Sequence, residues 1–189
     1  CAGNSGVLYC AVGGNLEKAN PPQGCQQKGS IMPYCFDPIG VVHSPYHQTA
    51  GMPIQPTVKS SAPGTVEIFP EYIPGLKDLD GFSHIMLIYV FHQAGNASLH
   101  VKPFLDSELR GVFATRAPSR PNPIGISIVE LLKVDVGTLF IANLDILDGT
   151  PLLDIKPFVP DFDGHPEARI GWLQASRGQI PSTRADDRF

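Results

Sequence analysis

Residues 82–92 of this chain read FSHIMLIYVFH and form its longest apolar stretch. The stretch is rich in β-branched and aromatic side chains, which favour strands. A turn signal, Asp80-Gly81, stands directly before it. We therefore predict a buried β-strand over residues 82–92, and the rest of the fold is interpreted outward from it.

Shorter apolar segments on both sides of this stretch also predict strands. They lie at residues 39–43, 65–69, 98–102, 111–115, 126–136, 138–144 and 152–156. Gly137 separates two of them and indicates a hairpin, while a weak helix signal covers only residues 168–175. Such short segments, with no regularly alternating helices, indicate an all-β fold. A barrel and a sandwich of about seven short strands, with long loops and little helix, both fit this pattern.

The composition agrees with a folded β-rich chain. The 189 residues include 19 glycines and 19 prolines, and so many helix breakers argue against an all-α fold. The net charge is -4, and residues 37–164 hold 8 Lys and Arg against 14 Asp and Glu. These totals show no basic face for non-specific nucleic-acid binding. No apolar stretch approaches the ~20 residues needed to cross a bilayer, so we expect no membrane span.

The N-terminal segment has a composition of its own. Residues 1–36 are rich in Gly, Asn, Gln and Pro and contain all four cysteines: Cys1, Cys10, Cys25 and Cys35. Their spacing matches no zinc motif and leaves open two disulfides, in one of three pairings, or reduced thiols. The start at Cys1 is compatible with a lipidated secreted binding domain and with a fragment, and we favour the fragment. We predict an extension over residues 1–36, a β-domain over 37–164 and a short tail over 165–189.

The first stretch with chemical potential is TRAPSRPNPIG, residues 115–125. Three prolines within six residues restrict the backbone, so this loop loses little entropy when it binds a ligand. Arg116 and Arg120 lie on it and present planar donor groups that suit a carboxylate or a phosphate. The stretch is therefore interpreted either as a binding loop or as a rigid turn with solvated arginines.

The second stretch is DILDGTPLLDIKP, residues 145–157, which carries Asp145, Asp148 and Asp154 around an Asp-Gly turn. Carboxylates in such a loop can accept hydrogen bonds from ribose hydroxyls or from an amino group. An ordinary β-turn with surface carboxylates is the alternative interpretation.

Two histidines frame the central stretch. His84 and His92 share parity, so both would face one side of a regular strand. No third metal ligand is evident, and we favour strand-end histidines that form hydrogen bonds over a metal site. The sequence contains no G-x-S-x-G elbow and no P-loop, which gives no support to a serine hydrolase or a nucleoside triphosphatase.

Taken together, these stretches resemble the TsaA/TrmO-like family. The matching phrases are IGVVHSPY, DLDGFSHIMLIYVFH, GVFATRAPSRPNPIGISIVEL and LDGTPLLDIKPF, within residues 38–163. The resemblance implies a single closed β-barrel that acts as a cytoplasmic homodimer and uses S-adenosyl-L-methionine. It also implies methylation of the exocyclic amine of threonylcarbamoyl-adenosine, next to the anticodon of a tRNA partner.

The resemblance implies a set of cofactor contacts, residue by residue. They are Pro53, Ile54, Gln55, His92, Gln93, Arg116, Ile126, Asp145, Ile146, Leu147 and Asp148. Ile54 replaces an arginine that is usual in the family, and Ala117 stands where serine is common. Bacterial tRNA-modifying members carry a longer C-terminal domain that helps to bind tRNA, whereas only about 25 residues follow Asp163 here.

The catalytic residue is left open at this stage. An acceptor amine conjugated to a purine is a weak nucleophile, and a base that takes its proton can assist it. Asp148, Asp154 and His92 are the candidates for this base. Two other functions remain open: a methyltransferase for a small molecule or a protein, and a binding module for S-adenosylmethionine or a nucleoside without transferase activity.

Overall fold

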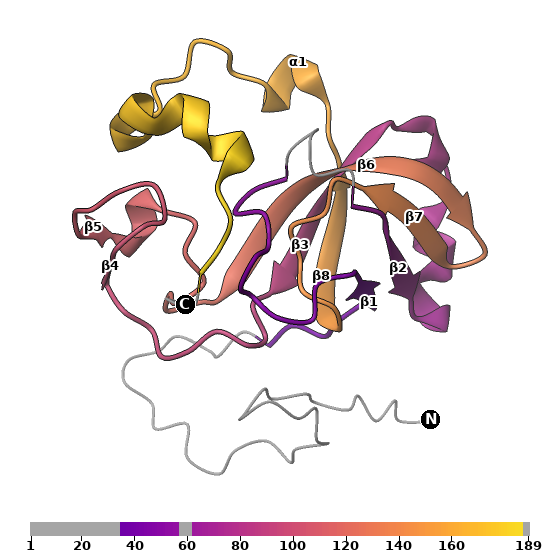
Figure 1. Ribbon diagram of the computed structural model, residues 1–189. Coiled ribbons are helices and arrows are strands. Elements are labelled where there is room, and N and C mark those ends of the chain that lie inside the picture. The colour runs from indigo at the N-terminus through magenta and orange to yellow at the C-terminus, as the bar shows by residue number, and fades with distance from the viewer. Residues whose placement is uncertain (1–34, 57–61, 187–189) are drawn as a thin grey trace, which may run out of the picture. The chain divides into compact units, whose positions relative to one another are not determined.

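The computed structural model describes residues 35–56 and 62–186. The sheet lies in the unit Pro38–Phe189 and closes into a six-stranded antiparallel barrel (Figure 1). The barrel strands are β1 (Gly40–His43), β2 (Gly64–Ile68), β3 (His84–Val90), β6 (Ile124–Asp135), β7 (Thr138–Ala142) and β8 (Thr150–Pro157). Their order is β1-β2-β7-β6-β3-β8, and β8 pairs with β1 to close the barrel.

The prediction of an all-β closed barrel with little helix is confirmed, although six strands rather than about seven close the barrel. A separate two-stranded sheet pairs β4 (His100–Val101) with β5 (Arg110–Gly111). The described helices are short: α1 (Pro160–Asp163) and the 3-10 helices η1 (Pro70–Leu76), η2 (Leu79–Gly81), η3 (Val112–Ala114) and η4 (Gly171–Ser182).

The prediction of a strand at residues 111–115 is wrong. This segment forms η3, and the Thr115 hydroxyl donates to the carbonyl oxygen of Val112 at 2.8 Å to close the turn. Val112 is buried with Val101 and Ala117 in a small cluster separate from the barrel core. Of the apolar residues that suggested a strand, Val112 is buried in this local cluster, whereas Phe113 is exposed.

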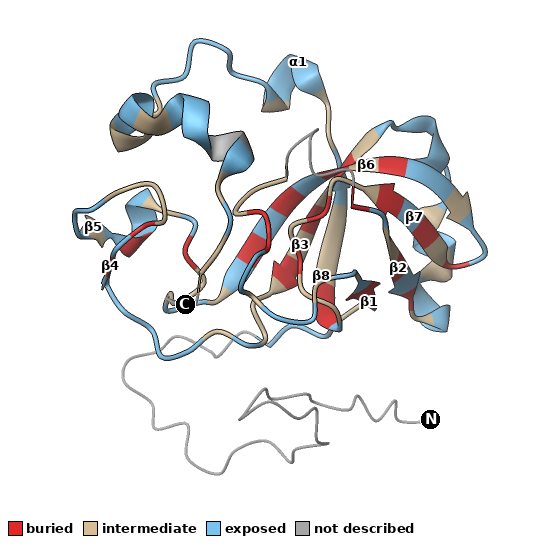
Figure 2. Ribbon diagram, in the orientation of Figure 1, coloured by how far each residue is buried: buried red, intermediate tan, exposed pale blue. Residues whose placement is uncertain are grey.

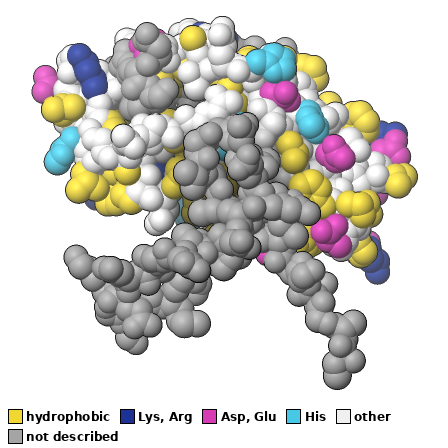
Figure 3. Space-filling model, turned by 90° about the horizontal axis from the view of Figure 1, so that it is seen from below, with side chains coloured by type: hydrophobic (Ala, Val, Ile, Leu, Met, Phe, Trp, Pro, Cys, Tyr) yellow, Lys and Arg dark blue, Asp and Glu magenta, His cyan; other side chains and the backbone are white. Residues whose placement is uncertain are grey.

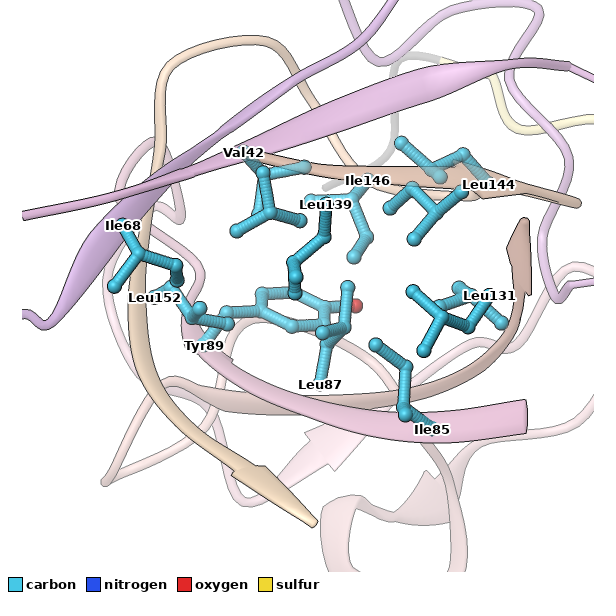
Figure 4. Close-up of a cluster of buried hydrophobic side chains, with 13 residues drawn as sticks. Val42, Ile68, Ile85, Leu87, Tyr89, Leu131, Leu139, Leu144, Ile146 and Leu152 are labelled. Carbon is cyan, nitrogen blue, oxygen red and sulfur yellow. The ribbon is translucent and has the colours of Figure 1, made fainter. Parts of the chain in front are cut away.

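Strand β3 explains why the central stretch organises the barrel. Its side chains alternate, with Ile85, Leu87 and Tyr89 buried inside. Figure 2 shows the same alternation of buried and more exposed residues along β3 and β6. The inward residues of all six strands meet in one core, in which Tyr89 lies across the barrel interior (Figure 4). Each fully buried aliphatic side chain contributes about 1.5–3 kcal/mol.

The predicted hairpin at Gly137 joins β6 to β7. Val136 and Gly137 both have positive φ, at 31° and 84°. A two-residue turn of this kind matches the twist of the flanking strands and normally carries Asn-Gly or Gly-Gly. Val136 is 90% exposed, so it occupies a strained backbone position without packing in return.

A side lobe lies beside the barrel and consists of residues 95–123 and 165–186. The first part contains β4, β5 and η3, and the second contains η4. The Trp172 indole N–H donates to the carbonyl of Ala114 at 2.8 Å, and the Ser176 hydroxyl donates to the carbonyl of Leu105 at 3.1 Å. These contacts join the two parts of the side lobe, which Figure 1 shows on the left of the barrel.

Some sequence predictions fall largely outside the described residues. Cys1, Cys10 and Cys25 lie there, whereas Cys35 is described as exposed and not in a disulfide. The three-part division at residues 36–37 and 164–165 stays a prediction. Within residues 35–56 and 62–186, no helix has the length and apolar character required to cross a membrane.

Candidate cofactor and acceptor site

A cavity of about 1030 Å³ lies between one end of the barrel and the side lobe. Its walls come from three places: the loop that contains Pro53, the strand ends around Tyr89 and Asp145, and the side lobe around Arg116 and Trp172. Pockets for small ligands usually enclose ≈ 300–1,000 Å³, so the space suits a nucleoside-sized cofactor together with part of an acceptor.

The structure brings together ten of the eleven residues that the resemblance implies as cofactor contacts. Those that line the cavity are Pro53, Ile54, Gln55, His92, Gln93, Arg116, Ile126, Asp145, Ile146 and Leu147. They come from five segments that are far apart in the sequence, and only the fold makes them neighbours. Asp148 does not line the cavity.

The deepest polar feature of the cavity is a hydrogen-bonded chain that ends on Asp145. The Ser127 hydroxyl donates to Asp145 Oδ1 at 2.6 Å, so the Tyr89 hydroxyl at 3.1 Å must donate to Ser127 Oγ. Burial raises the pKa of the Tyr89 phenol, which keeps it protonated as a donor. Burial also raises the pKa of Asp145 to about 6. At neutral pH the cavity therefore contains an ionised carboxylate that favours a cationic ligand.

Arg116 and Gln55 connect the side lobe to the Pro53 loop. Arg116 Nη1 donates to Gln55 Oε1 at 2.8 Å, across 61 residues of sequence. The amide of Gln55 donates in turn to the carbonyl of Ile54 at 2.7 Å. Arg116 is exposed, so its guanidinium keeps donors for an anionic or carbonyl group of a ligand.

The proline-rich loop is held by Arg120 and does not depend on proline alone. Arg120 Nη1 donates to the carbonyls of Thr115 and Ala117, both at 3.3 Å. The Phe91 N–H donates to the carbonyl of Pro123 at 2.7 Å and ties the loop to the end of β3. Arg120 therefore stiffens the loop that presents Arg116.

His92 follows β3 and faces the cavity. The Thr150 hydroxyl donates to the carbonyl of Leu147 at 2.7 Å, so its oxygen accepts from His92 Nδ1 at 3.3 Å. His92 Nε2 then carries the lone pair and accepts from the side-chain Nε2 of Gln93 at 3.3 Å. Burial lowers the pKa of His92, although the charge of Asp148 opposes this shift. His92 is therefore a neutral proton acceptor at physiological pH.

The other two candidates for the base lie elsewhere. The Asp148 carboxylate accepts from the Ser44 N–H at 3.1 Å and lies 3.4 Å from His47 Nδ1, outside the cavity. Asp154 lies on β8, opposite Ile88 of β3, and its carboxylate forms an ion pair with Lys156 at 2.8 Å. Of the three carboxylates in the acidic stretch, only Asp145 reaches the cavity.

The two histidines of the central stretch have separate surroundings. His84 contacts Phe158 edge-on and bonds to the Ser83 hydroxyl at 3.0 Å, whereas His92 lies in a turn after β3 has ended at Val90. The prediction that His84 and His92 form hydrogen bonds near the ends of the strand is confirmed. Among residues 35–56 and 62–186, no group of three metal-binding side chains occurs.

Sequence reasoning missed the contribution of the C-terminal segment. Trp172, Leu173, Ala185 and Asp186 line the cavity, although residues 165–189 were expected to be only a tail. Backbone hydrogen bonds link Gly51 and Met52 to Ala185, both at 2.8 Å. The single tryptophan of the chain was the available signal, because a lone Trp in a polar segment needs a packing partner.

Three comparisons describe what this chain is similar to. A family model described as the tRNA-methyltransferase O N-terminal domain matches residues 41–164. A protein of Pyrococcus abyssi (strain GE5 / Orsay), named a probable S-adenosyl-L-methionine-binding protein, is 52% identical over 155 residues. That alignment covers 82% of this chain and 84% of the relative.

Two tRNA-methyltransferase relatives are matched over a smaller share of their own length. The tRNA (adenine(37)-N6)-methyltransferase of Escherichia coli (strain K12) is 40% identical over 151 residues, which are 75% of this chain and 64% of the relative. The crystal structure of TrmO from Pseudomonas aeruginosa superimposes with a TM-score of 0.64 and 39% identity. It covers 75% of this chain and 63% of that protein. The chain thus spans slightly less than two thirds of these two proteins.

Proposed function

This chain belongs to the family of the tRNA-methyltransferase O N-terminal domain, and from that premise we propose that it is an S-adenosylmethionine-dependent tRNA methyltransferase. The proposed acceptor is the exocyclic N6 amine of adenine 37, in the threonylcarbamoyl form that the family resemblance implies. The observation that carries the proposal is the single cavity in which residues of the Pro53 loop, the proline-rich loop and the acidic stretch meet.

The residues of the cavity suit this cofactor, which when bound supplies a methyl group on a positively charged sulfur. Asp145 offers a carboxylate where the ligand carries positive charge, and Arg116 and Gln55 offer donors for a carboxylate or a ring edge. Phe91, Ile146 and Leu147 supply apolar surface for an adenine ring. Because Asp145 has a pKa of about 6, we expect the affinity for the cofactor to rise as the pH increases through 6.

His92 is proposed as the group that receives the proton of the acceptor amine. Its Nε2 carries the lone pair, and the bond from Nδ1 to Thr150 fixes that tautomer. Replacement of His92 by Ala should lower the transfer rate by ~10²-fold or more. A fall in rate of less than about threefold, with cofactor binding intact, would remove His92 from this role.

The test of the proposed function separates binding from transfer. Calorimetry with S-adenosylmethionine measures cofactor binding, and labelled cofactor with total tRNA measures transfer. Mass spectrometry of tRNA nucleosides, from cells with and without the gene, then identifies the acceptor. Cofactor binding without transfer to tRNA would indicate a binding module or a methyltransferase for another acceptor.

We further propose that the protein is a homodimer that associates through the outer face of β3 and β6. Ile128 projects outward on β6, 38% exposed and away from the cavity lining, and pairs with Met86 of β3. Contiguous apolar side chains on a sheet face commonly indicate a protein interface. Ile128→Lys should shift the mass in analytical ultracentrifugation from dimer to monomer, and an unchanged mass would exclude this face.

Action on tRNA would place the protein in the cytoplasm.

A further inference from the structure

The fold gives the side lobe and the rest of the molecule net charges of opposite sign, although the total for the whole sequence does not reveal this difference. The side lobe holds seven Lys and Arg against four Asp and Glu, whereas the remaining described residues hold three against twelve. Figure 3 shows acidic side chains gathered over the barrel half of the face it presents. A polyanion that approaches the molecule is therefore repelled by the barrel and attracted by the side lobe.

Three basic side chains of the side lobe are exposed to solvent outside the cavity. Lys102, Arg169 and Arg177 are all exposed, and none of the three lines the cavity. Arg110, by contrast, pairs with Asp106 at 2.7 Å and lies over the Trp172 ring, so it holds the lobe together. Lys102, Arg169 and Arg177 can therefore contact a ligand outside the cavity without altering the cavity itself.

The side lobe also exposes an aromatic ring at the cavity. Phe113 lines the cavity and is 76% exposed, a large value for an apolar side chain. Trp172 lines the same wall. Proteins that bind single-stranded RNA combine basic grooves, which follow the backbone, with aromatic side chains on which unstacked bases lie. The side lobe carries exposed basic side chains together with the exposed ring of Phe113.

We propose that the side lobe docks the sugar-phosphate backbone of the RNA substrate, with Lys102, Arg169 and Arg177 on phosphates and Phe113 against an unstacked base. This inference rests on the proposed function, because the site served is the one that would modify tRNA. It assigns a binding role to residues 165–186, which carry Arg169 and Arg177.

The test compares two triple variants of the full chain. Lys102→Ala, Arg169→Ala and Arg177→Ala together remove three charges from the side lobe. The matched control removes three from the barrel, by Lys77→Ala, Lys133→Ala and Lys156→Ala, whose side chains are also exposed. Binding to total tRNA is measured at several salt concentrations, together with cofactor binding and thermal unfolding.

The loss of three phosphate contacts should make the negative slope of log K against log salt shallower by about 2. This change corresponds to a roughly hundredfold weaker tRNA affinity near 0.1 M salt. The control should keep the wild-type slope, and both variants should keep cofactor affinity. If the side-lobe variant kept the wild-type slope while the wild type methylated tRNA, the inference would fail and the proposed function would stand. A wild type that bound cofactor but neither bound nor methylated tRNA would overturn both.

Discussion

Asp145 lines the cavity and is proposed to contact a cationic ligand, and its replacement by Asn tests both its burial and that proposed role. The carboxylate accepts the Ser127 hydroxyl at 2.6 Å within the cavity. Asn keeps the shape and an acceptor oxygen for Ser127 but cannot ionise. The substitution therefore removes a buried negative charge without opening a void.

The magnitude follows from the pKa. Burial raises the pKa of Asp145 from 3.8 to about 6, which corresponds to about 3 kcal/mol. Because the folded state holds this proton more tightly than the unfolded chain, the stabilising contribution is fully present below about pH 4. It is lost as the pH rises through 6. At pH 7.5 the Asn variant avoids this loss, although an unpaired amide N–H can cost about 1–3 kcal/mol. We expect a net stabilisation of about 1–2 kcal/mol.

Urea unfolding of the wild type and the Asn variant, at pH 7.5 and pH 4.5, measures this difference. The variant should be the more stable protein at pH 7.5, and its advantage should shrink by about 2 kcal/mol at pH 4.5, where Asp145 is protonated in the wild type. The same variant should bind S-adenosylmethionine more weakly at pH 7.5. A variant whose relative stability did not change with pH would refute the assignment of a raised pKa to Asp145.

Three further substitutions test the packing of the cavity floor, the backbone of a turn and the ligand contacts. A Cβ on Gly125 would overlap the Tyr89 ring, so Gly125→Ala should cost about 1–3 kcal/mol in chemical unfolding. Gly111→Ala, with no atom within 4 Å of its Cβ, is the control and should be nearly neutral. Val136→Asn should raise stability by about 1 kcal/mol, because Asn tolerates the positive φ of this exposed turn; a lower melting temperature would contradict the turn geometry. Arg116→Ala should weaken calorimetric binding of S-adenosylmethionine by about 1–3 kcal/mol, and unchanged affinity would remove this side chain from the site.

The strands of the barrel could be predicted because their pattern is local. Ile85, Leu87 and Tyr89 alternate with outward residues, and a period of two is visible in the sequence without knowledge of the partners. Residues 111–115 show the limit of such reasoning. Val112 packs with Val101 from a one-turn helix while Phe113 stays exposed, and a segment this short has no period that separates the two structures.

The candidate site was likewise predictable in part from the sequence. The unusual phrases around Arg116 and Asp148 identified the family, and most of the implied contacts face one cavity. Asp148 is the exception, because its carboxylate turns to Ser44 and two histidines at the surface. The exact direction of a side chain in a turn depends on partners that lie about a hundred residues away, and no pattern near Asp148 reports them.

The sequence by itself determined the β-rich class of fold and the hairpin at Gly137, since each depends on local periodicity or on the residue types present. The tertiary structure alone decided which carboxylate enters the cavity, that residues 165–186 form part of its wall, and that the side lobe has a net positive charge whereas the remaining described residues have a net negative one. Burial, shifted pKa values and charge segregation arise from contacts between distant segments. They exist only once the barrel has closed and the side lobe has packed.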